Sequence, residues 1–389
     1  MKKTIFLITT AFILTMVGFY SCKKDNIIEE PPAVVHGDGT ADNPYIISTP
    51  AQLDAIRDNL SAHYKLGKNI DLTAYLAPGG AGYAKWGEEG WRPIGTLYTE
   101  FTGSLDGADY KITGLWINRS STEFIGLFGF VENGTIKNIE VKIANDKSGV
   151  KGYYWAGGVA GHVHRGSITS CCVIGAVSGF IDVGGVVGRI ESGNITNCYA
   201  TGTVSGNYDV GGVLGTAGIG SIITNCYATS VISSYNNSVG GVAGYVNVSC
   251  IANCYFTGTI SGNNTVGGMV GRVYESNITN CYATGTVSGN YDVGGVLGIA
   301  GIGSIITNCY AAGMVSGSDY VGGVGGGVGG GGIIANCVAL TPSITANSSD
   351  GGRVVGELLS EALTNNWARS DMSITVDGAN KILDKGSDK

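Results

Sequence analysis

The stretch NITNCYATGTVSGNYDVGGVLG occurs twice without a single change, at residues 194–215 and again at residues 277–298. The two copies begin 83 residues apart. An active site is normally assembled once, from single residues that converge from different segments. A verbatim copy therefore indicates an architecture that is extended by duplication.

Shorter forms of the two halves of this stretch recur along the chain with a shared period. The GLFG and GGV-like elements begin at Gly126, Gly157, Gly184, Gly211, Gly240, Gly267, Gly294 and Gly322. The NCY-like elements define a cysteine column with steps of 27 to 32 residues, occupied by Ile139, Cys171, Cys198, Cys226, Cys254, Cys281, Cys309, Cys337 and Asn366. Short strands, 66 glycines and no long helical pattern predict an all-β fold, a right-handed parallel β-helix-like solenoid of about nine coils.

The alternation of apolar and charged residues indicates which side chains face the interior. Apolar residues alternate with charged ones from Ile139 onward, and the charges must face water, so the cysteine column faces inward. Ile195 lies three positions before Cys198, and both are buried only if the chain bends at Thr196 or Asn197. We therefore expect a corner at the asparagine column.

These elements resemble the GLUG-motif repeat family, which is named for a Gly-Leu-apolar-Gly element. The family occurs in bacterial surface proteins, including the non-catalytic, β-helical region of IgA-specific metallopeptidases. The resemblance covers most of residues 38–386. It implies a small α/β N-terminal cap module at 38–130, the GLUG repeat β-helix at 131–370 and a C-terminal tail at 371–389.

Within the cap module, the segment STPAQLDAIRDNL predicts a capped helix. Thr49 and Gln52 have the spacing of a capping box, and Pro50 suits the first helical position. The apolar stripe consists of Leu53, Ile56 and Leu60. We expect this helix to cover the open end of the solenoid, where unpaired strands would otherwise be exposed.

The N-terminus has the pattern of an export signal. Lys2 and Lys3 precede an apolar run that ends at FYSC. This pattern predicts a signal peptide at residues 1–21 and a lipid-anchored linker at residues 22–37. FYSC resembles a loose bacterial lipobox of the type found in lipoproteins of the Bacteroidota, which would attach lipid to Cys22. Cleavage without lipid is the alternative. We expect an outer-membrane or cell-surface location, with the membrane contacted through the lipid.

Composition argues against several classes of partner and chemistry. The formal net charge is −7, and residues 152–349 contain no basic stripe, so nucleic acid is not an expected partner. An odd number of cysteines besides Cys22 argues for small buried hydrophobes rather than full disulfide pairing. The zinc-binding motif HExxH is absent from the sequence. We expect His162 and His164 to be a solvated pair. We predict no metal and no cofactor.

An enzyme that acts on polysaccharides is the most specific catalytic alternative. Asp182, Asp209 and Asp292 share one column, but no basic residue accompanies them in the sequence, and turn residues explain them equally well. We therefore predict a protein that is not an enzyme.

The candidate binding face is a column of outward tyrosines that follow the cysteines, namely Tyr199, Tyr227, Tyr255, Tyr282 and Tyr310. An alternative edge contains Tyr208, Asp209, Tyr291 and Asp292. Such a ladder either stabilises the sheet or binds a ligand. The resulting hypothesis is an adhesin-like protein that binds a glycan or a host or bacterial surface protein, with a structural surface spacer as the alternative and a polysaccharide-active enzyme third.

Overall fold

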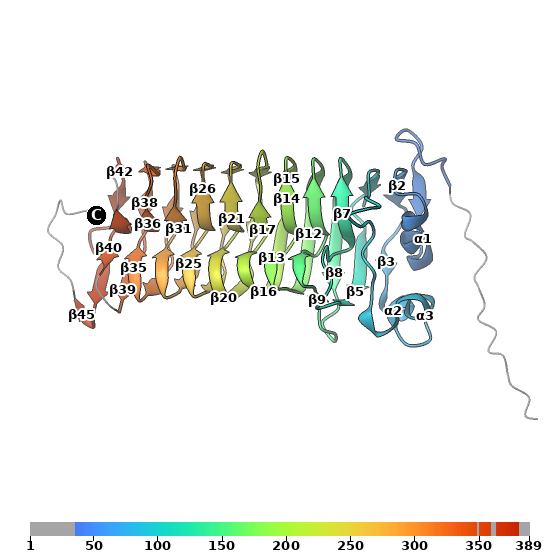
Figure 1. Ribbon diagram of the computed structural model, residues 1–389, viewed down its shortest axis with the longest axis horizontal. Coiled ribbons are helices and arrows are strands. Elements are labelled where there is room, and N and C mark those ends of the chain that lie inside the picture. The colour runs from blue at the N-terminus through green and yellow to red at the C-terminus, as the bar shows by residue number, and fades with distance from the viewer. Residues whose placement is uncertain (1–35, 348–349, 359–362, 381–389) are drawn as a thin grey trace, which may run out of the picture. The chain divides into compact units, whose positions relative to one another are not determined.

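The computed structural model describes residues 36–347, 350–358 and 363–380. This part of the chain is a β-solenoid of about ten turns, with small helices in its N-terminal region (Figure 1). The predicted all-β solenoid is confirmed, and the turn number is close to the nine that the cysteine column predicts. The predicted signal peptide, Cys22 and nearly all of the linker lie outside the described residues.

Nearly all strand pairs are parallel, and each joins one turn to the next. Nine strands form a separate sheet, which we call the Gly-rich sheet because each of its strands begins in the second half of a Gly-rich element, just after a bend. They are β7 (Phe128–Glu132), β11 (Ala160–His164), β14 (Val187–Glu191), β17 (Leu214–Ala217), β21 (Ala243–Asn247), β26 (Val270–Tyr274), β31 (Leu297–Ala300), β36 (Gly325–Val328) and β41 (Val355–Leu358).

The remaining strands form a second, continuous sheet that bends at corners. The strands that carry the isoleucine before the asparagine corner, or its equivalent, are β1 (Tyr45–Ile47), β2 (His63–Leu66), β4 (Ser104–Asp106), β8 (Thr135–Ile143), β12 (Ser167–Ser178), β15 (Asn194–Thr196), β18 (Ile222–Thr224), β22 (Cys250–Ala252), β27 (Asn277–Thr279), β32 (Ile305–Thr307), β37 (Ile333–Ala335) and β42 (Leu363–Thr364). Strands at or beyond that corner include β3 (Ile70–Asp71), β5 (Lys111–Leu115), β16 (Tyr199–Gly211), β19 (Tyr227–Ala228), β23 (Tyr255–Phe256), β28 (Tyr282–Ala283), β33 (Tyr310–Ala311), β38 (Val338–Ala339) and β43 (Trp367–Ala368).

Further strands complete each turn before the Gly-rich sheet. The first group consists of β6 (Ile117–Asn118), β9 (Val150–Lys151), β20 (Val231–Gly240), β24 (Thr259–Ser261), β29 (Thr286–Ser288), β34 (Val315–Gly317), β39 (Ser343–Ala346) and β44 (Ser373–Val376). The second consists of β10 (Tyr154–Ala156), β13 (Ile181–Gly184), β25 (Asn264–Gly267), β30 (Tyr291–Gly294), β35 (Asp319–Gly322) and β40 (Gly351–Gly352). At the C-terminal end β45 (Ala379–Asn380) pairs antiparallel with β44 and so covers one free strand edge.

The cysteine column lies in the core. Ile139 and Cys171 are in register, and the cysteines from Cys171 to Cys337 in this column are at most 1% exposed. The nine described cysteines are all free thiols, and Cys250, outside the column, is exposed. The expectation of small buried hydrophobes is therefore confirmed for the column.

The corners are made by residues with left-handed backbone conformation. The asparagine of each NCY element has a positive φ, for example 55° at Asn197 and 56° at Asn225, which asparagine tolerates better than most residues. The Asn225 amide also donates a hydrogen bond to Asn197 Oδ1 at 3.2 Å. The predicted corner is confirmed. A second positive-φ corner is occupied by Trp155, Asp182, Asp209, Ser238, Thr265, Asp292 and Tyr320.

The N-terminal region contains α1 (Pro50–Asp54), η1 (Ala55–Asp58), α2 (Thr73–Leu76), α3 (Ala81–Trp86) and η2 (Gly87–Glu89). Thr49 and Gln52 form the predicted capping box, and Leu53 and Ile56 are buried in the same core as the coils. The parallel ladder runs from β1 through β2 and β4 to β8, so solenoid stacking extends into residues 38–130. Among the described helices none is long and apolar enough to cross a membrane.

Candidate functional site

The five predicted tyrosines form one continuous stack on successive strands. Ring centroids of neighbouring tyrosines are 4.6 to 5.1 Å apart, and neighbouring ring planes differ by only 2 to 4°. Each ring is half-buried. Neighbouring rings therefore cover one another's faces, and the ladder presents ring edges and hydroxyl groups to solvent rather than open aromatic faces.

The tyrosine ladder has different neighbours at its two ends. Cys172 precedes Tyr199 in register, and Val338 and then Trp367 follow Tyr310. Contact with the Cys172 thiol, followed by burial, raises the pKa of Tyr199 well above its ordinary value. Trp367 is 70% exposed and extends the column, a residue that the sequence prediction did not name. The alignment of NNWAR with NCYAT would have identified it.

The alternative edge is not one cluster. Tyr208 packs against Phe180, with ring centroids 5.9 Å apart, and Tyr291 is 48% exposed. Asp209 instead lines a cleft of about 360 Å³ together with Ser238, Tyr245, Asn247, Arg272 and Tyr274. Burial, followed by the nearby charge of Asp182, raises the pKa of Asp209 to about 7, and burial raises that of Asp292 to about 6.

The expectation that no basic residue accompanies the aspartates is wrong. Arg189 Nη1 donates to Asp182 Oδ2 at 3.2 Å, and Arg272 shares the cleft with Asp209. Asp182 also accepts hydrogen bonds from Trp155 Nε1 at 2.9 Å and Thr216 Oγ1 at 2.5 Å. Burial still raises the pKa of Asp182 despite these partners. The arginines come from the Gly-rich sheet, which folds across the corner from the aspartates.

The expectation of a solvated histidine pair is also wrong. His162 is 9% exposed, and burial lowers its pKa to about 4. Its ring packs against Phe130 at 4.8 Å and Trp155 at 5.7 Å, and neither ring nitrogen forms a hydrogen bond within the described region. His164 Nδ1, in contrast, lies 2.7 Å from Glu132 Oε2. No group of three or more potential metal ligands occurs among the described residues.

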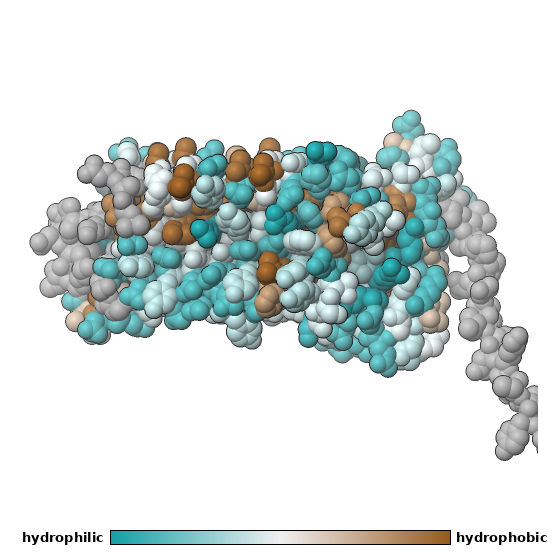
Figure 2. All heavy atoms as spheres, viewed as in Figure 1, coloured by the Kyte–Doolittle hydropathy of each residue, from teal (hydrophilic) through white to brown (hydrophobic). Residues whose placement is uncertain are grey.

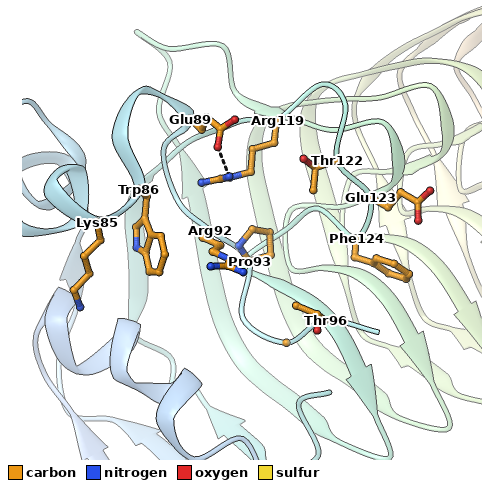
Figure 3. Close-up of a pocket in the computed structure, with 11 residues that line it drawn as sticks. Lys85, Trp86, Glu89, Arg92, Pro93, Thr96, Arg119, Thr122, Glu123 and Phe124 are labelled. Carbon is orange, nitrogen blue, oxygen red and sulfur yellow. Dashed lines mark hydrogen bonds and ion pairs between the residues drawn. The ribbon is translucent and has the colours of Figure 1, made fainter. Parts of the chain in front are cut away.

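A cleft of about 400 Å³ lies in the N-terminal region, outside the repeated elements. Figure 3 shows Trp86 and Phe124 on opposite sides of it, with Arg92 below the ion pair of Arg119 and Glu89. The Trp86 indole nitrogen is buried and forms no hydrogen bond with the described residues. We call this the N-terminal cleft.

Exposed isoleucines occur along another edge of the solenoid. Ile222, Ile305 and Ile333 are 39 to 48% exposed at equivalent strand positions. Cys250 and Asn277 occupy the intervening positions of this row. Figure 2 shows apolar side chains gathered along the upper edge of the same region. The apolar row is therefore interrupted by a thiol and an amide.

Comparison with known proteins supports the repeat assignment. Residues 181–205 and 262–288 match the family model of the GLUG motif. A "Putative Gly-rich membrane protein" of Evansella cellulosilytica is 40% identical over 134 residues, which are 34% of this chain and 15% of that protein. Halomucin of Haloquadratum walsbyi is 44% identical over 123 residues, 30% of this chain and 1% of that protein. The chain thus spans only a small part of both relatives.

Among solved structures, a "putative immunoglobulin A1 protease" from Bacteroides ovatus is similar over 91% of this chain and 83% of its own, with 20% identity and a TM-score of 0.37. The likeness is too distant to transfer any activity. The two motif matches coincide with strands of the observed solenoid, β13 to β16 and β25 to β29. The chain is therefore a β-solenoid protein that carries GLUG repeats.

Proposed function

We propose that this chain is a non-catalytic surface protein whose solenoid displays a binding face for a glycan or for a protein of another cell surface. The observation that carries the proposal is the tyrosine ladder, in which five half-buried rings repeat at 4.6 to 5.1 Å along successive coils. Tyrosine combines a large apolar edge with a hydroxyl group, which suits contact with partly polar surfaces.

The ring geometry determines how a ligand contacts the ladder. Because neighbouring tyrosines stack on one another, a sugar ring or apolar side chain meets ring edges and hydroxyl groups rather than ring faces. Each such contact is weak. A long ligand that contacts several tyrosines at once binds with higher overall affinity. After its first contact has formed, the remaining contacts form within one complex. An extended polymer is therefore the preferred partner over a small molecule.

The surface location rests on the N-terminal sequence and on the relatives. The predicted signal peptide and the lipid on Cys22 would place the solenoid outside the cell, and one relative is described as a membrane protein. A structural spacer is the second candidate, because stacked cross-strand aromatic pairs contribute roughly 0.2 to 1 kcal/mol each to sheet stability without any ligand.

The experiment replaces three central rungs, Tyr227, Tyr255 and Tyr282, together by serine. Binding of the purified full chain to polysaccharide and matrix-protein arrays should fall at least tenfold, while the circular-dichroism spectrum changes little. The matched control removes three exposed apolar side chains from the other edge by serine substitution at Ile222, Ile305 and Ile333. If ligands bound by the parent chain bind both variants equally, the ladder is not the binding face. If the tyrosine variant unfolds, the ladder is structural.

A further inference from the structure

We propose that the N-terminal cleft binds a sugar residue that carries a carboxylate, such as a hexuronic acid. The cleft is separate from the tyrosine ladder, so the proposal stands even if the ladder binds nothing. Its volume of about 400 Å³ falls within the range of roughly 300 to 1,000 Å³ that is typical of small-ligand pockets.

Most cations around the cleft already pair with a carboxylate of the protein. Asp54, only 1% exposed, pairs with Arg57 Nη2 at 2.8 Å and with Lys85 Nζ at 2.9 Å. Arg119 pairs with Glu89. One buried carboxylate thus serves two cations, which leaves this side of the cleft with excess positive charge.

Arg92 is the cation left for a ligand. Within the described part of the chain, no carboxylate lies at ion-pair distance from its guanidinium. The guanidinium lies 5.5 Å from the centre of the Trp86 ring, and Arg57 lies 4.9 Å from the same ring. A planar guanidinium held against an indole presents its remaining N–H groups as a fork that fits a carboxylate.

Trp86 supplies a second, independent feature. Its indole nitrogen is buried without a hydrogen-bond partner among the described residues, although buried polar groups are normally paired. An acceptor oxygen on a ligand would satisfy this donor after a small adjustment of the surrounding side chains. The unpaired donor thus belongs to the same side chain against which the Arg92 guanidinium packs.

The rest of the lining favours a sugar over a simple anion. Trp86 and Phe124 face the cleft from opposite sides and offer apolar surface for the C–H groups of a sugar ring (Figure 3). Thr96 and Thr122 offer hydroxyl groups, and Glu123 offers a carboxylate that accepts hydrogen bonds from sugar hydroxyls. A small inorganic anion would leave these groups unused.

The cleft is preorganised by contacts behind it. Arg57 donates to the carbonyl oxygens of Pro93 at 3.2 Å and Arg92 at 2.8 Å, and Trp91 Nε1 donates to the Leu127 carbonyl at 3.0 Å. Gly95 has a φ of 81°, and a Cβ there would lie 2.5 Å from the Phe130 carbonyl oxygen. A fixed backbone around Arg92 reduces the entropy lost on binding.

Isothermal titration of the purified full chain with glucuronic acid tests the proposal, with glucose and acetate as matched probes. We expect glucuronic acid to bind at least tenfold more tightly than either. Arg92→Gln should weaken that binding at least tenfold, whereas Arg165→Gln, at an exposed site elsewhere, should leave it unchanged. Equal binding of glucose would overturn the role of Arg92, and equal binding of acetate would overturn the sugar assignment.

Two further measurements keep the test decisive if Arg92→Gln fails to fold. Trp86→Phe removes the unpaired donor but keeps an aromatic ring, and it should weaken glucuronic acid binding several-fold. Raising the salt concentration should weaken glucuronic acid binding to the parent chain, since the contact is ionic. The triple tyrosine variant should bind glucuronic acid like the parent chain. Glucuronic acid binding that is insensitive to both salt and Trp86→Phe would contradict the proposal.

Discussion

Deletion of residues 194–276 joins Gly193 to Asn277 and removes three whole coils. We expect the shortened chain to fold into the same solenoid, because the strands that meet at the junction keep their register. In the parent chain Asn194, Ile222, Cys250 and Asn277 are successive partners in one ladder, so Asn277 takes the place of Asn194. Three strand spacings of about 4.8 Å correspond to a loss of about 14 Å in length.

The loss in free energy of unfolding at the new junction can be calculated from one residue position. From 194 to 228 and from 277 to 311 the sequences differ only where Ile299 replaces Thr216. Thr216 Oγ1 donates to buried Asp182 Oδ1 at 2.5 Å, and isoleucine cannot. A buried acceptor oxygen that loses its hydrogen-bond donor costs about 1 to 3 kcal/mol of stability. Adding Ile299→Thr to the deletion should restore most of that free energy of unfolding.

Urea unfolding followed by circular dichroism measures the stability, and small-angle X-ray scattering measures the length. A deletion of residues 194–281 is the out-of-register control, since it also removes the buried side chains of Ile278 and Cys281. We expect this control to aggregate or unfold. If the 194–276 deletion also fails to fold, or if Ile299→Thr does not stabilise it, the coils are not interchangeable units.

Two further predictions concern the anchor and one buried carboxyl group. Cys22→Ala should move the protein from the membrane to the soluble fraction, because lipid is the proposed anchor; unchanged fractionation would contradict the lipobox hypothesis. Asp209 has its pKa raised from 3.8 to about 7, mainly by burial, so its contribution to stability falls as pH rises through that interval. In urea unfolding, Asp209→Asn should therefore raise the free energy of unfolding by about 3 kcal/mol more at pH 8.5 than at pH 5, because the interval from pH 5 to pH 7 corresponds to about 1.4 kcal/mol per pH unit. Asp146→Asn, at an exposed site, is the control for the change of charge.

Features that repeat in every coil could be predicted from the sequence. The inward cysteine column and the asparagine corner each recur many times, so one alternation of apolar and charged residues around Ile139 fixes the orientation of all copies. The tyrosine column follows from the same period. Its stacked geometry does not, because ring orientation depends on side-chain torsions that residue spacing does not determine.

Features that occur once could not be predicted in the same way. The Asp182–Arg189 pair forms because the chain turns at Asp182 and returns along β14, so residues seven positions apart meet across a corner. His162 is buried because Phe130 from the preceding turn packs against it. The N-terminal cleft combines residues 85–96, which precede the repeats, with residues 119–124 of an early coil, and only folding brings Arg92 and Phe124 to the same cleft.

The parallel ladders have a mechanical consequence. Hydrogen bonds between coils run along the solenoid axis, and the described N-terminal and C-terminal coils lie at its opposite ends (Figure 1). A pull along this axis loads the interfaces between coils in series, so they separate one after another rather than shearing together. Each released coil of about 27 residues would extend to about 90 Å. Under tension such a protein would lengthen stepwise and limit the force transmitted to whatever it holds.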